Sequence, residues 1–212
     1  MGVLNLGYSD IPKIVLERHM RIGATAAIAA ILMLAACGRL AETEAEAETE
    51  KDVLVAEAFI DSFYSFDAAE LRTALLNAGE SAPSILYYQG WAKGGNYEVV
   101  NRMPCVIRSP ALISCSITVK DDLIGALGID FNVTDTFELS LSDGNIVSVE
   151  TSSNDPQAYY DARDWVRQQR PELVDEHCRG YFDGGPTPGK CVQAMVQGYA
   201  EFIASREYAE TQ

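Results

Sequence analysis

Histidine is scarce in this sequence, with 2 residues in 212. His19 precedes the apolar segment near the N-terminus, so only His177 lies in the rest of the chain. Acid–base enzymes and catalytic triads most often use a histidine. The sequence also lacks a Gly-x-Ser-x-Gly elbow and a phosphate-binding glycine loop. These absences favour a protein that is not an enzyme, with His177 as a surface or loop residue.

Basic residues are also few, with 16 Lys and Arg against 31 Asp and Glu and a formal net charge of −15. Nucleic-acid binding needs clustered Lys and Arg, so this balance argues against it. Docking on anionic lipid by charge alone is disfavoured for the same reason. An acidic surface that keeps the protein soluble is the simpler interpretation.

The sequence has no long apolar run. The longest uncharged apolar stretch, Ile22 to Ala36, falls short of the about 20 residues that a membrane span needs. It has the length of the apolar core of a signal peptide, with Arg18 and Arg21 as its positive flank. Because Asp10 and Glu17 are unusual at the start of a leader, we expect translation to begin at Met20.

This stretch ends in Leu34-Ala35-Ala36-Cys37, which resembles the lipobox of bacterial lipoproteins. The resemblance implies cleavage before Cys37, a lipid anchor with palmitate or a related acyl chain on that residue, and a domain that faces the periplasm. The membrane is then a partner through the lipid. Gly38 stands where an Asp tends to retain lipoproteins in the inner membrane, so the outer membrane is favoured. A secretory signal with a chance cysteine is the alternative.

The chain divides into four predicted segments. A signal peptide covers residues 1–36, an acidic tether 37–52, a folded domain 53–170 and a helical extension 171–212. The tether alternates Glu with Ala and Thr, and its glutamates stand four residues apart, where like charges destabilise a helix. We interpret it as a solvated spacer; an acidic segment that docks a basic partner is the alternative.

Cys37 leaves four of the five cysteines, an even number that predicts two disulfides in an exported chain. Three pairings are possible. We favour Cys105–Cys115, which is symmetric about Pro110 as in two neighbouring strands, and Cys178–Cys191, which closes a loop rich in Gly and Pro. A zinc site is the rival interpretation, but neither pair has Cys-x-x-Cys spacing.

Hydrophobic periodicity predicts three helices before a group of strands. Ala56 to Phe63 has a helical apolar face, and Asp67 with Glu70 forms a capping box for a helix from Ala68 to about Asn77. A third helix should run from Ser81 to Gly94. Period-two alternation then predicts an edge strand with Val99, Met103, Cys105 and Ile107 on one face, and a second strand with Ile113, Cys115, Ile117 and Val119 facing inward. A helical turn Asp122–Leu127 should follow, and then a hairpin about Asp143-Gly144 in which Phe137, Leu139 and Leu141 alternate with polar residues. The chain should end with a helix to Gln169 and a last helix Cys191–Ala204.

Three helices followed by antiparallel strands resemble the nuclear transport factor 2-like superfamily, in its SnoaL-like branch. The segments Phe59–Leu71 and Phe137–Val149 carry the resemblance, which covers Val53 to about Arg170. It implies an α+β fold in which three N-terminal helices pack in a curved, cone-shaped antiparallel sheet. The helical, disulfide-tied C-terminal tail departs from the minimal family domain.

No catalytic motif of that superfamily maps onto this sequence, and we predict no metal and no cofactor. The candidate pocket residues are Phe63, Tyr87, Tyr88, Trp91, Asp130 and Phe137. Core packing is the more frequent use of such aromatic clusters. We expect a non-catalytic domain that binds a small apolar ligand or an envelope protein, with a homodimer as a further possibility. The alternative is a lyase- or isomerase-like enzyme that uses a carboxylate inside the cone, with Asp130 as the best candidate base.

Overall fold

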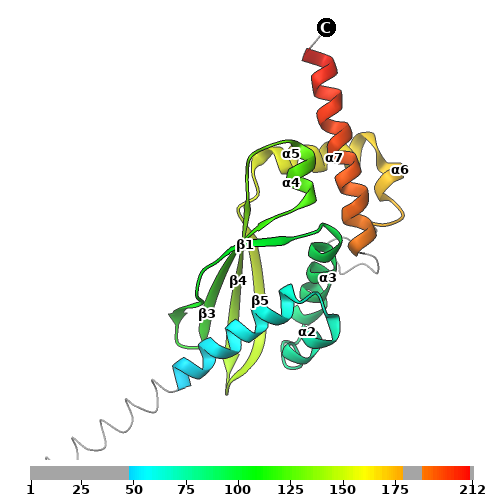
Figure 1. Ribbon diagram of the computed structural model, residues 1–212. Coiled ribbons are helices and arrows are strands. Elements are labelled where there is room, and N and C mark those ends of the chain that lie inside the picture. The colour runs from blue at the N-terminus through cyan, green and yellow to red at the C-terminus, as the bar shows by residue number, and fades with distance from the viewer. Residues whose placement is uncertain (1–47, 179–187, 211–212) are drawn as a thin grey trace, which may run out of the picture. The chain divides into compact units, whose positions relative to one another are not determined.

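The computed structural model describes residues 48–178 and 188–210 (Figure 1). The predicted signal peptide, the lipidation site Cys37 and most of the acidic tether lie outside the described residues. Residues 48–52 of the predicted tether do lie within them, and there they continue the helix of residues 53–64. Once residues 53–64 form a helix, extending it by one more turn, Glu48 to Asp52, costs little, because only nucleation is unfavourable.

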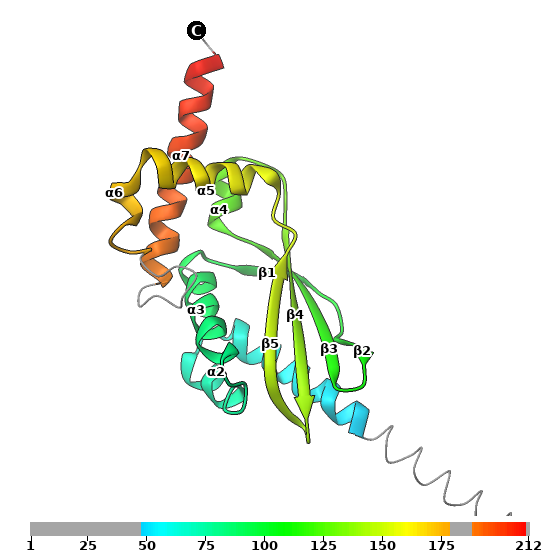
Figure 2. The ribbon, with the colours of Figure 1, turned by 180° about the vertical axis from the view of Figure 1, so that it is seen from behind.

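The described residues form a mixed α+β fold with an antiparallel sheet and a C-terminal helix, as the sequence predicts (Figures 1 and 2). The sheet order is β1-β3-β4-β5, with β2 also pairing with β3. The strands are β1 (Glu98–Arg102), β2 (Val106–Ser109), β3 (Leu112–Lys120), β4 (Val133–Ser142) and β5 (Asn145–Ser153). Helical residues 48–64 are followed by α2 (Ala68–Ala74), α3 (Ser81–Gly94), α4 (Asp122–Leu127), α5 (Gln157–Gln169), α6 (Pro171–Val174) and α7 (Pro188–Glu210).

Local sequence signals set several of these boundaries. The Asp67 carboxylate accepts the backbone N–H of Ala69 at 2.7 Å and so caps α2. The predicted capping box made the Glu70 side chain the acceptor for the Asp67 N–H. In the structure this N–H donates instead to Ser65 Oγ at 3.1 Å. The helix ends at Ala74, earlier than predicted, because the chain must turn before α3 begins.

The core lies between the inner face of β3–β4 and the N-terminal helix with α3. Phe59, Phe63 and Phe137 are fully buried, and the Phe137 ring centroid lies 5.7 Å from that of Phe59 and 4.9 Å from that of Phe63. Edge-to-face contacts of this kind add to the burial of apolar area. The alternation that predicted Phe137, Leu139 and Leu141 on the inner face of β4 is confirmed.

The edge of the sheet differs from the prediction of one strand with an apolar inner face. β1 and β2 are separate, and every residue of both is exposed. Pro104, between them, has no N–H to donate to a ladder. Cys105 is buried and forms the predicted disulfide with Cys115, and Cys178–Cys191 forms the second. The four sulfurs that the zinc interpretation would use as ligands are paired with each other in these two disulfides.

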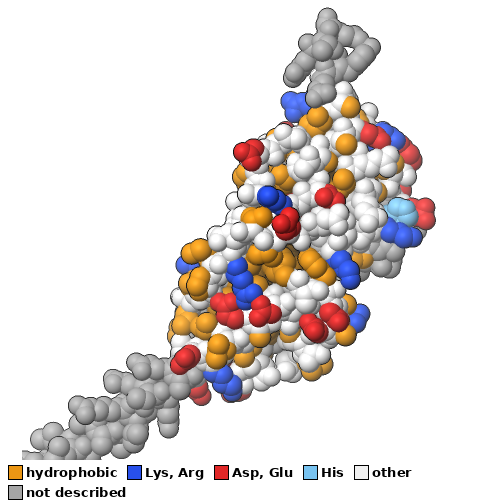
Figure 3. All heavy atoms as spheres, viewed as in Figure 1, with side chains coloured by type: hydrophobic (Ala, Val, Ile, Leu, Met, Phe, Trp, Pro, Cys, Tyr) orange, Lys and Arg blue, Asp and Glu red, His pale blue; other side chains and the backbone are white. Residues whose placement is uncertain are grey.

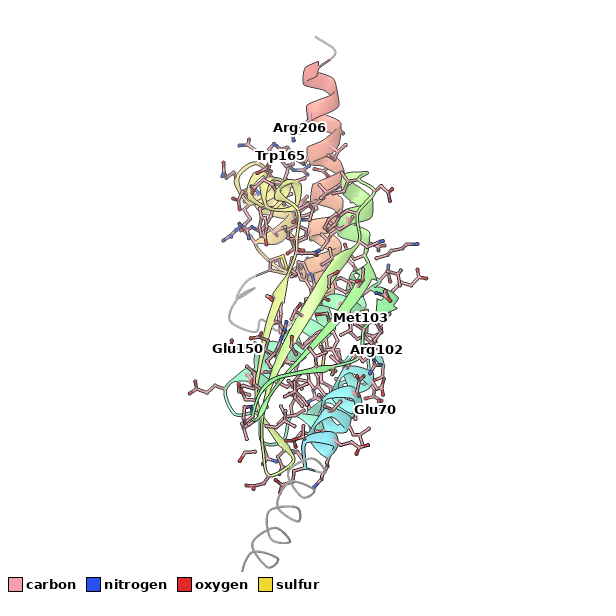
Figure 4. The ribbon with its side chains drawn as sticks, turned by 90° about the vertical axis from the view of Figure 1, so that its left-hand side faces the viewer. Glu70, Arg102, Met103, Glu150, Trp165 and Arg206 are labelled. Carbon is pink, nitrogen blue, oxygen red and sulfur yellow. A yellow bond between two sulfur atoms is a disulfide. The ribbon has the colours of Figure 1, made fainter. Side chains whose placement is uncertain are left out.

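An ion-paired cluster ties this edge to the N-terminal helix. The Arg102 guanidinium contacts Asp61 and lies 2.6 Å from Glu57 Oε2, while the backbone N–H of Cys105 donates to Glu57 Oε1 at 2.6 Å. Figure 4 shows Arg102 against that helix, with Met103 beside it. Exposed ion pairs contribute little stability individually, so this cluster mainly fixes where the edge lies.

The C-terminal helix α7 packs against α3, α4 and α5. A Cβ added to Gly94 would lie 2.4 Å from the Gly189 Cα, and one added to Gly90 would lie 2.5 Å from the Pro188 ring. The backbones of α3 and α7 therefore approach more closely than any larger residue would allow. Residues 48–178 and 188–210 belong to one compact unit, in which α7 of the predicted extension packs on helices of the predicted domain.

We expect Gly94→Ala to destabilise the protein by about 2 kcal/mol or more, because the new methyl group meets backbone that cannot move aside without separating α3 from α7. The matched control is Gly125→Ala in α4, where the added Cβ has no neighbour within 4 Å. Gly125→Ala should be neutral or stabilise by about 0.5 kcal/mol. Urea denaturation of the full-length chain in detergent measures both, and equal midpoints for the two variants would contradict the contact.

Candidate binding cleft

A cleft of about 400 Å³ is lined by residues of α3, of β5 and of the start of α5. Its lining combines aromatic rings with hydroxyl groups and one carboxylate. The lining residues are Ser84, Tyr87, Tyr88, Trp91, Tyr97, Thr151, Ser152, Ser153, Asp155 and Tyr159. Flat rings with polar tips and a few convergent polar groups are typical of small-molecule sites.

Helical spacing brings the α3 residues of the cleft together. Ser84, Tyr87, Tyr88 and Trp91 stand at i, i+3, i+4 and i+7, which is one face of a helix. Gln89 points the other way and donates from Nε2 to the carbonyls of Ser62 and Phe63, each at 3.0 Å. This amide fixes α3 against the N-terminal helix.

A second bond fixes α3 against the sheet. Ser81, the first residue of α3, accepts the backbone N–H of Val149 in β5 on its Oγ at 3.0 Å. Because the bond joins the start of α3 to β5, it fixes the distance between two elements that line the cleft.

Behind the aromatic wall lies Asp135, a carboxylate on the inner face of β4 with 1% of its surface exposed. The Tyr64 hydroxyl donates to its Oδ2 at 3.1 Å, and its Oδ1 has no hydrogen-bond partner among the described residues. Burial raises the pKa of Asp135 to about 6, against the lowering effect of the Tyr88 and Tyr64 hydroxyls. A buried carboxyl group with one unbonded oxygen is uncommon and requires an explanation.

Asp135 acts on two of the residues that line the cleft. The pKa of the Tyr88 and Tyr97 hydroxyls lies well above the ordinary tyrosine value. Burial is the largest cause in both, and the negative charge of Asp135 is a further cause. Both tyrosines therefore stay protonated and can only donate or accept hydrogen bonds.

Asp121 is a second carboxylate near the cleft. It caps α4 by accepting the N–H of Ile124 at 2.8 Å, and burial raises its pKa to about 6.

Asp155 brings a third carboxylate to the rim of the cleft. The Ser153 hydroxyl donates to its Oδ2 at 2.6 Å, and the Tyr160 hydroxyl at 3.4 Å. Asp121, Asp135 and Asp155 form no ion pair with any Lys or Arg that the structure describes. Their negative charge is consequently not neutralised within the described part of the protein.

The predicted pocket residues separate into three groups. Tyr87, Tyr88 and Trp91 line the cleft, while Phe63 and Phe137 are buried in the core. Asp130, the candidate base of the alternative enzyme function, does not line the cleft. Asp130 is exposed in the loop after α4, because that loop runs outside the sheet.

Asp135, Tyr97 and Tyr159 were not among the predicted pocket residues. A signal for Asp135 was present, because the alternation of β4 continues back from Phe137 through Asp135 to Val133. Tyr97 follows α3 in a loop, and Tyr159 belongs to a helix that is distant in sequence, so only the tertiary structure brings them to the cleft.

His177 lies away from this cleft, at a shallow polar hollow with Lys190 and Glu172. Within residues 48–178 and 188–210, no group of three or more His, Cys, Asp or Glu could hold a metal ion. Nor does any helix in those ranges combine the length and apolar character needed to cross a membrane. Figure 3 shows acidic and basic side chains intermixed on one face rather than gathered in a patch of one sign.

Comparison with protein-family models, curated proteins and solved structures finds no match to this chain.

We expect Asp135→Asn to stabilise the protein at pH 7.5 and to lose this advantage near pH 4. The folded-state pKa of about 6 lies above the unfolded value of 3.8, so the aspartate favours folding below pH 3.8 and loses that contribution as the pH rises through 6. The gain at pH 7.5 is at most about 3 kcal/mol, since the asparagine oxygen still accepts from Tyr64. Denaturation midpoints at both pH values measure it.

Asp130→Asn is the matched control, because it removes the same charge from an exposed loop. Its effect should be close to zero at both pH values. If Asp135→Asn destabilises the protein equally at pH 4 and pH 7.5, the buried carboxylate is not ionised against a burial penalty at neutral pH.

Proposed function

We propose that this chain is a lipid-anchored protein of the bacterial cell envelope whose domain binds a small ligand in the cleft without chemical transformation. The Leu34-Ala35-Ala36-Cys37 pattern supports the anchor. The two disulfides support an oxidising compartment outside the cytoplasm, because cytosolic thiols are kept reduced. With Gly38 after the anchor, the outer membrane is the favoured location.

The composition of the cleft carries the proposal for binding. Five aromatic rings and several hydroxyl groups surround it, and no His, Lys, Arg or Cys is among its lining residues. A site for acid–base or nucleophilic catalysis places such groups within hydrogen-bond reach of the substrate. Asp155 is the one carboxylate in the lining, and its bonds to Ser153 and Tyr160 orient it without an acid partner.

The proposal extends to the fold. We infer that helical residues 48–64, α2 and α3 pack in the concave side of a cone-shaped sheet, in the manner of the nuclear transport factor 2-like superfamily. The inward phenylalanines of the helix and of β4 support this, as does the β4–β5 hairpin at Asp143-Gly144, where both residues have positive φ. In that arrangement the aromatic core fills the centre of the cone, and the cleft lies at its mouth.

A second candidate function is a lyase- or isomerase-like activity that uses Asp135. The observation in its favour is a buried carboxyl group with a pKa of about 6 directly behind Tyr88, since such a value suits a general base. Asp135 itself does not line the cleft, so any proton would have to pass through the Tyr88 hydroxyl. Binding therefore agrees better with the geometry.

The first test is the mass of the protein extracted from membranes in mild detergent, measured native and then denatured without reductant. The denatured mass should equal acylated Cys37–Gln212 less four hydrogens, and Cys37→Ser should lack the acyl mass. The native spectrum should show an additional non-covalent mass. An unlipidated or uncleaved chain would overturn the anchor.

We expect Ser84→Trp to remove that additional mass, because the indole would occupy the cleft from the exposed face of α3. Ser142→Trp, at an exposed serine of β4 outside the cleft, is the matched control and should keep it. Loss from both variants, or from neither, would place the ligand elsewhere. Release of a chemically altered product on incubation would favour the second candidate function.

A further inference from the structure

The cleft combines electron-rich rings with negative charge that has no positive counterpart. Tyr87, Tyr88, Trp91, Tyr97 and Tyr159 supply the rings. The faces of such rings attract cations within about 6 Å of the ring centroid. An apolar or anionic ligand would gain only the contact area, whereas a cation would gain the ring quadrupoles as well.

Three carboxylates act on the same region. The charges of Asp121, Asp135 and Asp155 all raise the pKa of the Tyr97 hydroxyl, which lines the cleft. None of the three pairs with a described Lys or Arg, and no basic side chain is among the lining residues. Negative potential in a cleft with low-dielectric walls concentrates cations there.

Asp135 carries part of this negative charge, and no described Lys or Arg forms an ion pair with it. Its Oδ1 is buried without a hydrogen-bond partner among them. A positive ligand on the other side of the Tyr88 and Tyr97 rings would lower the cost of ionising this carboxylate without touching it. The buried charge of Asp135, which is unfavourable by itself, would then contribute to binding.

Asp155 supplies a direct contact at the rim. The hydrogen bonds that it accepts from described side chains both go to Oδ2, which leaves Oδ1 for a ligand. The hydroxyls of Ser84 and Thr151 can bond to polar groups on the rest of the ligand. The cleft volume of about 400 Å³ exceeds the need of a bare metal ion and suits an organic molecule.

We propose that the cleft binds an organic cation, a substituted ammonium group enclosed by Tyr87, Tyr88, Trp91, Tyr97 and Tyr159 with Asp155 as its carboxylate partner. This inference rests on the proposed binding function and names its ligand class. Methyl groups on the nitrogen favour ring contact over a hydrated ion pair, so quaternary ammonium compounds fit better than a primary amine.

The test uses choline and its neutral isostere 3,3-dimethylbutan-1-ol, which has carbon in place of the charged nitrogen. Binding to the full-length chain in detergent is followed by tryptophan fluorescence. Of the two tryptophans, Trp165 packs on Phe202 outside the cleft. The variant Trp165→Phe leaves Trp91 as the reporter. We expect choline to bind at least about tenfold more tightly than the isostere.

Two pairs of variants assign the effect. Asp155→Asn should weaken choline binding by about tenfold and leave the isostere unchanged. Glu150→Gln removes the same charge from an exposed residue of β5 outside the lining and should change neither (Figure 4). Tyr87→Leu should weaken choline binding, and Tyr87→Phe, which keeps the ring, should restore it.

The outcomes separate this inference from the proposal on which it rests. Equal binding of choline and the isostere, or a ligand mass in the native spectrum that belongs to a neutral or anionic compound, would overturn the cation and keep the binding function. If neither probe binds and the native spectrum shows no ligand, both proposals fail. Choline binding that survives Asp155→Asn and Tyr87→Leu unchanged would place the cation outside the cleft.

Discussion

The close approach of α3 and α7 constrains the rest of the described structure. It exists only because Gly90 and Gly94 have no Cβ where they meet the Pro188 ring and the Gly189 Cα. With α7 in this position, α3 is held on three sides: by α7, by the N-terminal helix through Gln89, and by β5 through the bond to Ser81. Since α3 supplies three of the five rings in the cleft, contacts that lie outside the cleft determine its shape.

The buried Asp135 connects stability with the proposed function. A hydrophobic residue on the inner face of β4 would avoid the cost of a charge that is almost completely removed from water. Proteins retain such groups where they serve a site, and the perturbed pKa of Asp135 beside a cleft fits that pattern. The Tyr64 and Tyr88 hydroxyls hydrogen-bond to Asp135, and Tyr88 also lines the cleft. The field of the negative charge therefore reaches the cleft, although the carboxylate itself is buried.

Local signals in the sequence predicted local structure well. The cap at Asp67, the end of α4 at Gly128 and the Asp143-Gly144 turn are read from adjacent residues, and both disulfides followed from spacing. Features that depend on distant segments could not be read in this way. A glycine in α3 carries no mark of the α7 backbone opposite it, and Tyr159 reaches the cleft only because β5 and α5 bring it back to α3. Asp130 stands out in the sequence because it lies between the apolar residues Ile129 and Phe131, whereas Asp135 is one position in the alternating pattern of β4.

The interrupted strand at the sheet edge bears on how copies of this protein behave when they are crowded together. An exposed edge with apolar residues such as Val99, Met103 and Ile107 is a template on which another chain could add a strand. Here the ladder is broken between β1 and β2 at Pro104, and the register shifts in each of the two short pairings with β3. Neither piece presents the long, regular row of N–H and C=O groups that cross-β growth requires. The irregular edge is thus a structural guard against aggregation.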